Sequence, residues 1–156
     1  MLAQFSTKFR PKKLTWPQLL ELFKKARIFE GKVSQKLITL YKASDGFSVF
    51  NQIYLKVNGA VSIVDDLIYN SNTKKWILNE SKFGTTNQLT KNQKIIQDAI
   101  KGLKSLEIRT ARDLYDEFGN LIAKQGDKIK VDEILRSHSV NGSITNETIK
   151  TTWKKQ

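Results

Sequence analysis

The alternation of hydrophobic and polar side chains predicts three consecutive β-strands in the first half of the chain. Residues 47–57, 60–69 and 75–83 are rich in β-branched and aromatic side chains, as strands commonly are. Two groups of turn-forming residues separate them, Asn58-Gly59 and Asn70-Ser71-Asn72-Thr73. Because both connections are short, we expect the three strands to pair in sequence order as an antiparallel sheet.

Apolar residues at helical spacing predict helices before and after these strands. Trp16-Pro17 begins the first helix, and Gly31 separates it from a second helix over residues 32–43. Thr90 and Gln93 match a capping box at the start of a later helix. The apolar stripes of the first and the last of these helices are, in turn, Leu19, Leu20, Phe23 and Ala26, and then Ile95, Ile96, Ala99, Ile100 and Leu103.

The last third of the chain adds further short elements. We expect a strand at 106–111 that joins the sheet through a βαβ crossover, followed by a hairpin around Phe118-Gly119-Asn120. A short helix is predicted to end at Leu135, and Trp153 is expected to pack on the core. Together the elements predict an α/β fold with a mixed sheet, in which antiparallel hairpin strands are flanked by helices.

The length and the distribution of charge suggest how the chain is divided. At 156 residues it can bury one substantial core, so we expect one compact domain. Basic side chains are concentrated near the start, with ten basic and two acidic residues among the first 42. We therefore separate a basic N-terminal arm and helix at 1–27, derived from a linker, from a domain at 28–156.

The overall charge favours a polyanionic partner. The 27 Lys and Arg against 15 Asp and Glu give a net charge of +12, as nucleic-acid-binding domains often have. An anionic membrane surface or an acidic protein is the alternative. We expect no membrane span, because no apolar run is long enough for one, and no signal peptide. The chain is thus expected to be cytoplasmic or a piece of a larger exported protein.

Composition excludes several kinds of chemistry. The absence of Cys excludes disulfides, cysteine proteases and thiolate zinc sites. The single histidine, His138, argues against nucleases that use a pair of histidines, and we expect it to be structural or solvated. No Gly-x-Ser-x-Gly elbow, phosphate-binding loop or dinucleotide fingerprint is present.

Charged residues interrupt two of the predicted strands at positions where core strands are normally apolar. Asp65 and Asp66 lie in the second strand, and Glu80 and Lys82 lie in the third. Buried carboxylates need a partner or a metal ion. If the hairpin turns about Asn72-Thr73, Asp65 stands directly opposite Glu80, with their Cβ atoms roughly 4.5–5.5 Å apart. Lys82 then points to the same face as Glu80.

Two opposed carboxylates repel each other, and a divalent cation such as Mg²⁺ or Mn²⁺ would offset that repulsion. Asp65 and Glu80 are therefore the candidate metal ligands, and Lys82 is placed to hold or activate a water. The choice depends on the register, because a shift of one residue would bring Asp66 to that face instead.

These residues resemble a known family of nucleases. Asp65 followed by Glu80-Ser81-Lys82 is similar to the D…ExK core of the PD-(D/E)xK superfamily, which has the restriction-endonuclease-like fold. The wider pattern resembles nuclease domains at the C-termini of bacterial polymorphic toxins and contact-dependent inhibition effectors. It comprises Val64-Asp65-Asp66-Leu67, Glu80-Ser81-Lys82-Phe83-Gly84, Leu89-Thr90 and Gln93. Val64 replaces the proline that gives the superfamily its name, and the likeness covers about Glu30 to Leu106.

The resemblance implies a catalytic role for Asp65, Glu80 and Lys82 with Mg²⁺ or Mn²⁺, and it favours Asp65 over Asp66 as the ligand. The residues that it implies in supporting roles are Glu30, Asp66, Ser81 and Gln93. It also implies a toxin domain that is delivered within a larger effector, acts in the cytoplasm of a target cell and is neutralised by an immunity protein. DNA is the first expected substrate, and tRNA or another RNA is the second.

Other interpretations of the same residues remain. Gln93 is fully explained by its cap, and Glu30 by an ordinary charge near a helix end. Lys91, Lys94 and Lys101 on the exposed side of the last helix could contact phosphates or only water. The chain could also be a basic domain that binds nucleic acid without cutting it, or an interaction module in which Asp65, Glu80 and Lys82 form an ion-pair cluster.

Overall fold

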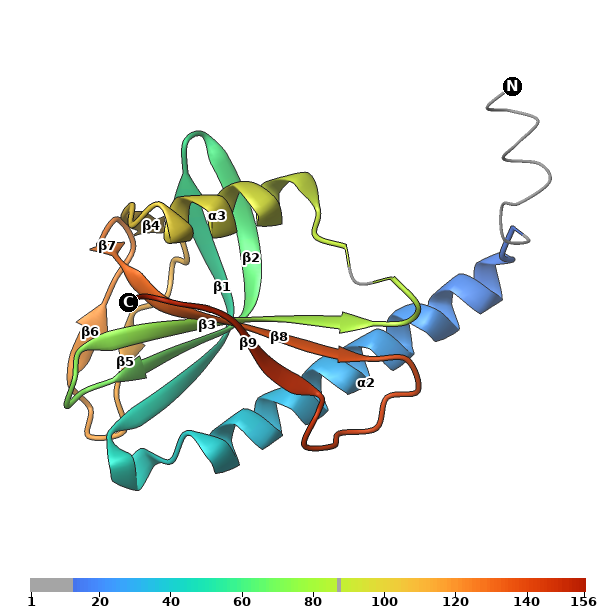
Figure 1. The fold of residues 1–156 in the computed structure, drawn as a ribbon, viewed down its shortest axis with the longest axis horizontal. Helices are drawn as coiled ribbons and strands as arrows, with labels where there is room; N and C mark the ends of the chain where they lie inside the picture. Colours follow the sequence, from blue (N-terminus) through green and yellow to red (C-terminus); the bar gives the residue numbers. More distant parts are fainter. Residues whose placement is uncertain (1–12, 87) are drawn as a thin grey trace.

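The fold is a mixed α/β arrangement of one large sheet with a helix on each face (Figure 1). The computed structural model describes residues 13–86 and 88–156. The helices are α2 (Trp16–Leu40) and α3 (Lys91–Lys101), with a short 3-10 turn, η1 (Ala43–Asp45). The strands are β1 (Phe47–Val57), β2 (Ala60–Asn70), β3 (Lys75–Phe83), β4 (Leu106–Ile108), β5 (Leu114–Tyr115), β6 (Leu121–Ala123), β7 (Lys128–Ile129), β8 (Val131–Ser139) and β9 (Ile149–Lys154).

The centre of the sheet is the predicted antiparallel meander. Seven strands pair in the order β7-β4-β1-β2-β3-β8-β9, and β5 and β6 form a separate hairpin around the predicted turn at 118–120. β1 pairs with β2 and β2 with β3, both antiparallel, so the three predicted strands are confirmed. The register between β2 and β3 sets Asp66 opposite Asn79 and Leu67 opposite Leu78, as expected from a turn at Asn72-Thr73.

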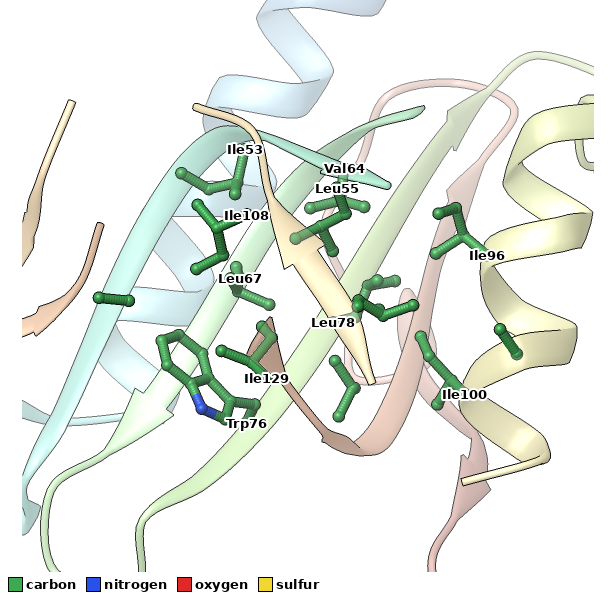
Figure 2. Close-up of a cluster of buried hydrophobic side chains, with 14 of the residues drawn as sticks. Ile53, Leu55, Val64, Leu67, Trp76, Leu78, Ile96, Ile100, Ile108 and Ile129 are labelled. Carbon is green, nitrogen blue, oxygen red and sulfur yellow. The ribbon is translucent and has the colours of Figure 1, made fainter. Parts of the chain in front are cut away.

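The two helices pack on opposite faces of this sheet. Consecutive strand residues point to opposite sides, and their partners differ accordingly. The α3 side holds a large cluster with Leu67, Leu78 and Ile134 from the strands and Ile96, Ala99 and Ile100 from α3 (Figure 2). The α2 side holds a smaller cluster of Phe29, Val33, Leu37, Ile68, Ile77 and Leu135. Each fully buried Leu or Ile side chain stabilises the fold by about 1.5–3 kcal/mol.

The helix α2 is continuous, so the predicted break at Gly31 is wrong. Glycine costs a helix interior only about 1 kcal/mol relative to alanine. The buried residues Phe29 and Val33 lie on either side of it and fix both halves against the sheet. The preceding part of α2 extends beyond the strands in Figure 1, and there Leu20 and Phe23 of the predicted stripe are 47% and 51% exposed.

Two expectations for the second half of the chain are wrong. The segment predicted as a helix up to Leu135 is the strand β8, which pairs in parallel with β3 along nearly its whole length. Both faces of β8 are covered, so its sequence lacks the alternation of a half-exposed strand. β4 pairs antiparallel with β1 at the far side of the meander, which excludes the βαβ crossover.

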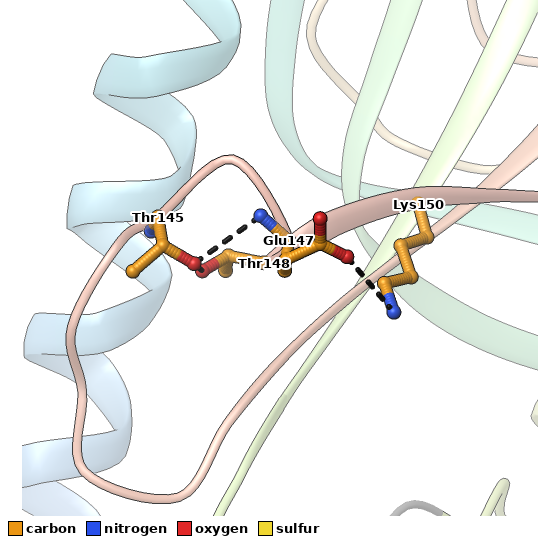
Figure 3. Close-up of polar contacts among 4 residues, drawn as sticks. All are labelled: Thr145, Glu147, Thr148 and Lys150. Atoms are coloured by element: carbon orange, nitrogen blue, oxygen red, sulfur yellow. Dashed lines mark hydrogen bonds and ion pairs between the residues drawn. The ribbon is translucent and has the colours of Figure 1, made fainter.

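Leu103 lies just beyond α3 and Trp153 lies on β9, and only the prediction for Trp153 is confirmed. The apolar stripe of α3 stops before Leu103, which has a positive φ of 60° and is 50% exposed just beyond the helix. β9 pairs antiparallel with β8, and Trp153 packs against the large cluster as expected. The loop before β9 is closed by contacts of Thr145 with Thr148 and by the Glu147–Lys150 ion pair (Figure 3). Among the described residues, no helix is long and apolar enough to cross a membrane.

Candidate active site

The candidate site lies where β2 and β3 separate, which we call the β2–β3 fork and define by Asp65 and Glu80. The two strands pair from Asn70 and Lys75 as far as Asp66 and Asn79, and their directions then diverge (Figure 1). Asp65 is the first residue of β2 past this paired segment. Its Oδ2 accepts a hydrogen bond from the backbone N–H of Ser81 at 2.7 Å. The Asp65 side chain therefore occupies the place of a strand acceptor and is held beside Glu80.

Glu80 lies on the α3 face of the fork and is joined to Lys82 by an amide from α3. Its side chain is only 2% exposed. Gln93 Nε2 donates to Glu80 Oε2 at 3.2 Å, and Lys82 Nζ donates to Gln93 Oε1 at 2.8 Å. The three side chains thus form a chain of hydrogen bonds in which the ammonium group lies close to the carboxyl group without touching it directly.

Gln93 also caps α3 with the same side chain that contacts Glu80 and Lys82. The backbone N–H of Thr90 donates to Gln93 Oε1 at 2.9 Å, and the backbone N–H of Gln93 donates to Thr90 Oγ1 at 3.2 Å. This is the predicted capping box, which is confirmed. Because the cap fixes the first turn of α3, it also fixes the amide that contacts Glu80 and Lys82.

Glu30 reaches the same place from α2. Burial, the negative charge of Asp65 and a hydrogen bond with Asp65 raise the pKa of Glu30 to about 7 from its ordinary value of 4.5. The charge of Asp66 acts in the same direction, and Arg27 opposes it. The structure therefore brings Glu30, Asp65 and Glu80 to one region, with Asp65 in contact with each of the other two.

The nearby positive charges of Lys82 and Arg136 only partly balance the carboxyl groups of the fork. Burial is the main reason that the pKa of Glu80 lies well above its ordinary value, and the charge of Asp65 adds to it. Lys82 and Arg136 lower the pKa of Glu80 but do not outweigh these effects. In the described part of the chain, no three Asp, Glu, His or Cys side chains converge closely enough to form a ready-made metal centre. The paired carboxylates are nonetheless hard oxygen donors that suit Mg²⁺ or Mn²⁺.

Asp66 belongs to a different network on the α2 face, in which Asp66 and Asn79 are fully buried and Asn51 reaches the surface. It has no exposed surface, and burial raises its pKa. Three side chains donate to its carboxylate: Ser34 Oγ at 2.6 Å, Asn51 Nδ2 at 2.8 Å and Asn79 Nδ2 at 2.9 Å. Asn79 continues the network, because its Oδ1 accepts from Ser137 Oγ at 2.7 Å. The register therefore directs Asp65 to the fork and Asp66 to a structural network beneath it.

Several residues of the site were not found from the sequence. Arg136 on β8 is paired in register with Glu80, and burial lowers the pKa of its guanidinium group. It was missed because the helix predicted to end at Leu135 left no strand that would bring Arg136 beside β3. Asn79 could have been recognised as a polar residue that alternates with Glu80 in a buried strand. His138 has its Nε2 within 3.0 Å of the Gly84 carbonyl oxygen, which agrees with a structural role.

The three lysines proposed to contact nucleic acid lie on the exposed side of α3, as expected. Lys94 forms an exposed ion pair with Asp98 at 2.9 Å, which neutralises part of its charge. Lys91 and Lys101 are the first and last residues of the helix. Their contact with phosphates stays a prediction.

No protein-family model, no curated protein and no solved structure matches this chain.

Proposed function

We propose that this protein is a metal-dependent nuclease that hydrolyses phosphodiester bonds, with DNA as its first substrate and RNA as the second. The observation that carries the proposal is the meeting of Asp65 and Glu80 at the β2–β3 fork, with Lys82 linked to Glu80 through Gln93. A pair of carboxylates with an adjacent ammonium group is suited to phosphoryl chemistry, because it can hold a cation and stabilise developing negative charge.

Each residue of the site has a separate role in the proposed hydrolysis. Asp65 and Glu80 would hold Mg²⁺ or Mn²⁺, which when bound offsets the charge of the phosphodiester and lowers the pKa of water. Lys82 orients the attacking water and donates a hydrogen bond towards the oxygens that gain charge as the bond to phosphorus breaks. Gln93 keeps Lys82 directed towards Glu80, and Ser81 fixes Asp65 through its backbone N–H.

The biological setting follows from the resemblance to toxin nuclease domains together with the charge. We propose that the domain acts in the cytoplasm of a target cell after delivery within a larger bacterial effector. The net charge of +12 supports binding to nucleic acid and an acidic immunity protein as the partner that blocks it. Co-expression with a neighbouring small reading frame should restore growth if that partner is encoded there, and absence of both rescue and complex formation would count against it.

The test is direct cleavage. Supercoiled plasmid, linear DNA and total RNA are incubated with the protein in Mg²⁺, with and without a chelator, and alongside Asp65→Asn and Lys82→Met. The proposal expects chelator-sensitive cutting by the wild-type protein and none by the two variants. Salt-sensitive binding without turnover would favour the non-catalytic basic domain instead.

A further inference from the structure

A pocket of about 540 Å³, lined mainly by polar residues, lies between α2 and β1 and adjoins the fork through Glu30. Its lining includes Arg27, Glu30, Gly31, Gln35, Asn51 and Gln52. Glu30 is shared with the candidate site, since its carboxyl group contacts that of Asp65. The volume falls in the range of pockets that hold small ligands or single groups of larger ones. A molecule that enters this pocket therefore reaches Glu30, whose carboxyl group contacts Asp65.

Gly31 lines the pocket, and a larger residue at this position would place its side chain in the open space there. Glycine is unfavourable in a helix interior, and Gly31 has no packing reason to be there, because a Cβ at this position would meet no atom within 4 Å. The opposite strand shows a second irregularity. Gln52 has a positive φ of 54° and is missing from the β1–β2 ladder at the position facing Asp65. Strained residues of this kind are concentrated at functional sites.

Glu30 and Asn51 are engaged by neighbouring side chains, but three other polar side chains of the pocket are available for a ligand. The side-chain amides of Gln35 and Gln52 make no hydrogen bond with other described residues. Arg27 makes no ion pair within the described part of the chain. Amide groups carry a donor and an acceptor side by side, which matches the edges of nucleobases, and a guanidinium group suits a phosphate.

We propose that this pocket binds an unpaired nucleotide next to the scissile phosphate. The proposal rests on the nuclease function proposed above and adds the class of substrate. Protruding elements read the grooves of a duplex, whereas a concave pocket accepts a base only after it has left the stack. The amides of Gln35 and Gln52 then contact the exposed base edge, and Arg27 contacts the adjoining backbone. The preferred substrate is accordingly single-stranded or contains a loop.

The experiment compares an oligonucleotide that contains an unpaired loop with a fully paired duplex of the same composition. Gly31→Leu places an apolar side chain in the pocket, and Gln52→Gly removes an amide while relieving the positive φ. Thr39→Leu adds the same apolar side chain as Gly31→Leu on an exposed part of α2 and serves as the control. Cleavage is measured in Mg²⁺, and binding is measured by fluorescence anisotropy in chelator, so that the pocket is tested without turnover.

The wild-type protein should cut and bind the looped oligonucleotide better than the duplex. Gly31→Leu and Gln52→Gly should each lose about tenfold or more on the looped substrate, with no loss for Thr39→Leu. Both variants should melt at or above the wild-type temperature, since each replaces an unfavourable backbone choice. Wild-type-like binding and cutting by Gly31→Leu would overturn the pocket while leaving the nuclease proposal intact. If the two pocket variants bind the looped oligonucleotide more weakly but the wild-type protein shows no metal-dependent cutting, the proposed nuclease function is wrong and the proposed nucleotide-binding pocket stands.

Discussion

The carboxylate of Asp65 accepts a hydrogen bond from the backbone N–H of Ser81 at 2.7 Å, at the residue where β2 leaves β3. The bond fixes the side chain of one strand to the main chain of its neighbour, so the separation of the strands does not separate Asp65 from Glu80. The acidic pair is therefore positioned by the fold itself. Groups held in advance in this way lose little freedom when a cation or a substrate binds.

Adjacent aspartates should respond to substitution in opposite ways. Asp66→Ala would remove the acceptor that Ser34, Asn51 and the buried Asn79 share, and Ser34 would lose its acceptor altogether, so the free energy of unfolding should fall by about 1–3 kcal/mol. Asp65→Asn keeps an oxygen for the Ser81 N–H and should cost less than about 1 kcal/mol, yet should stop cleavage. Urea denaturation of both variants checks this. Equal stability of Asp66→Ala and the wild-type protein would disprove the structural role of the network.

Substitutions at the start of α3 should separate the cap from the site. Thr90→Ala removes the cap alone and should cost about 1 kcal/mol of stability, with the cleavage rate of the folded protein unchanged. Gln93→Ala removes the cap and also the link between Lys82 and Glu80, so cleavage should fall about tenfold or more in addition. Melting curves and cleavage rates are measured on the same samples. If both variants cut equally well, Gln93 acts only as a cap.

The stability of the protein in chelator should decrease as the pH rises from about 4.5 to 7. The pKa of Glu30 is raised to about 7 from 4.5, so the folded state binds more protons than the unfolded state throughout this window. The free energy of unfolding therefore falls as the pH rises through it. The raised pKa of Glu80 acts in the same direction. Melting temperatures between pH 4.5 and 8 should show the decline, and Glu30→Gln should flatten it. A melting temperature that rises over this range would contradict the assignment.

The central hairpin could be predicted from the sequence because local rules determine it. The polar turn at 70–73 fixes the register as far as Asp66 opposite Asn79. Asp65 lies past the end of this ladder, so it is not a direct strand partner of Glu80 and is held by the Ser81 N–H instead. The capping box of α3 was equally local, since Thr90 and Gln93 are three residues apart. Elements that are determined by residues close together in the chain, such as this turn and this cap, could therefore be predicted from the sequence.

The other side of the site depends on tertiary contacts that no local pattern encodes. β8 is a strand because it pairs with β3, although the neighbouring Ile134 and Leu135 with charges on either side also suit a helix. The position of Arg136 beside Glu80 follows only from that pairing. α2 passes through Gly31 because Phe29 and Val33 are both buried, and their burial outweighs the cost of one glycine.

The central claim is that the acidic pair at the fork serves hydrolysis rather than stability, and Glu80→Gln tests it most directly. The variant keeps the shape of the side chain and an oxygen for Gln93 but removes a buried carboxyl group that is 2% exposed. Cleavage of labelled oligonucleotides in Mg²⁺ and the melting temperature in chelator are measured on the same protein. We predict a loss of about a hundredfold or more in cleavage rate, with a melting temperature equal to or above that of the wild-type protein. Cleavage at the wild-type rate by Glu80→Gln would contradict the account.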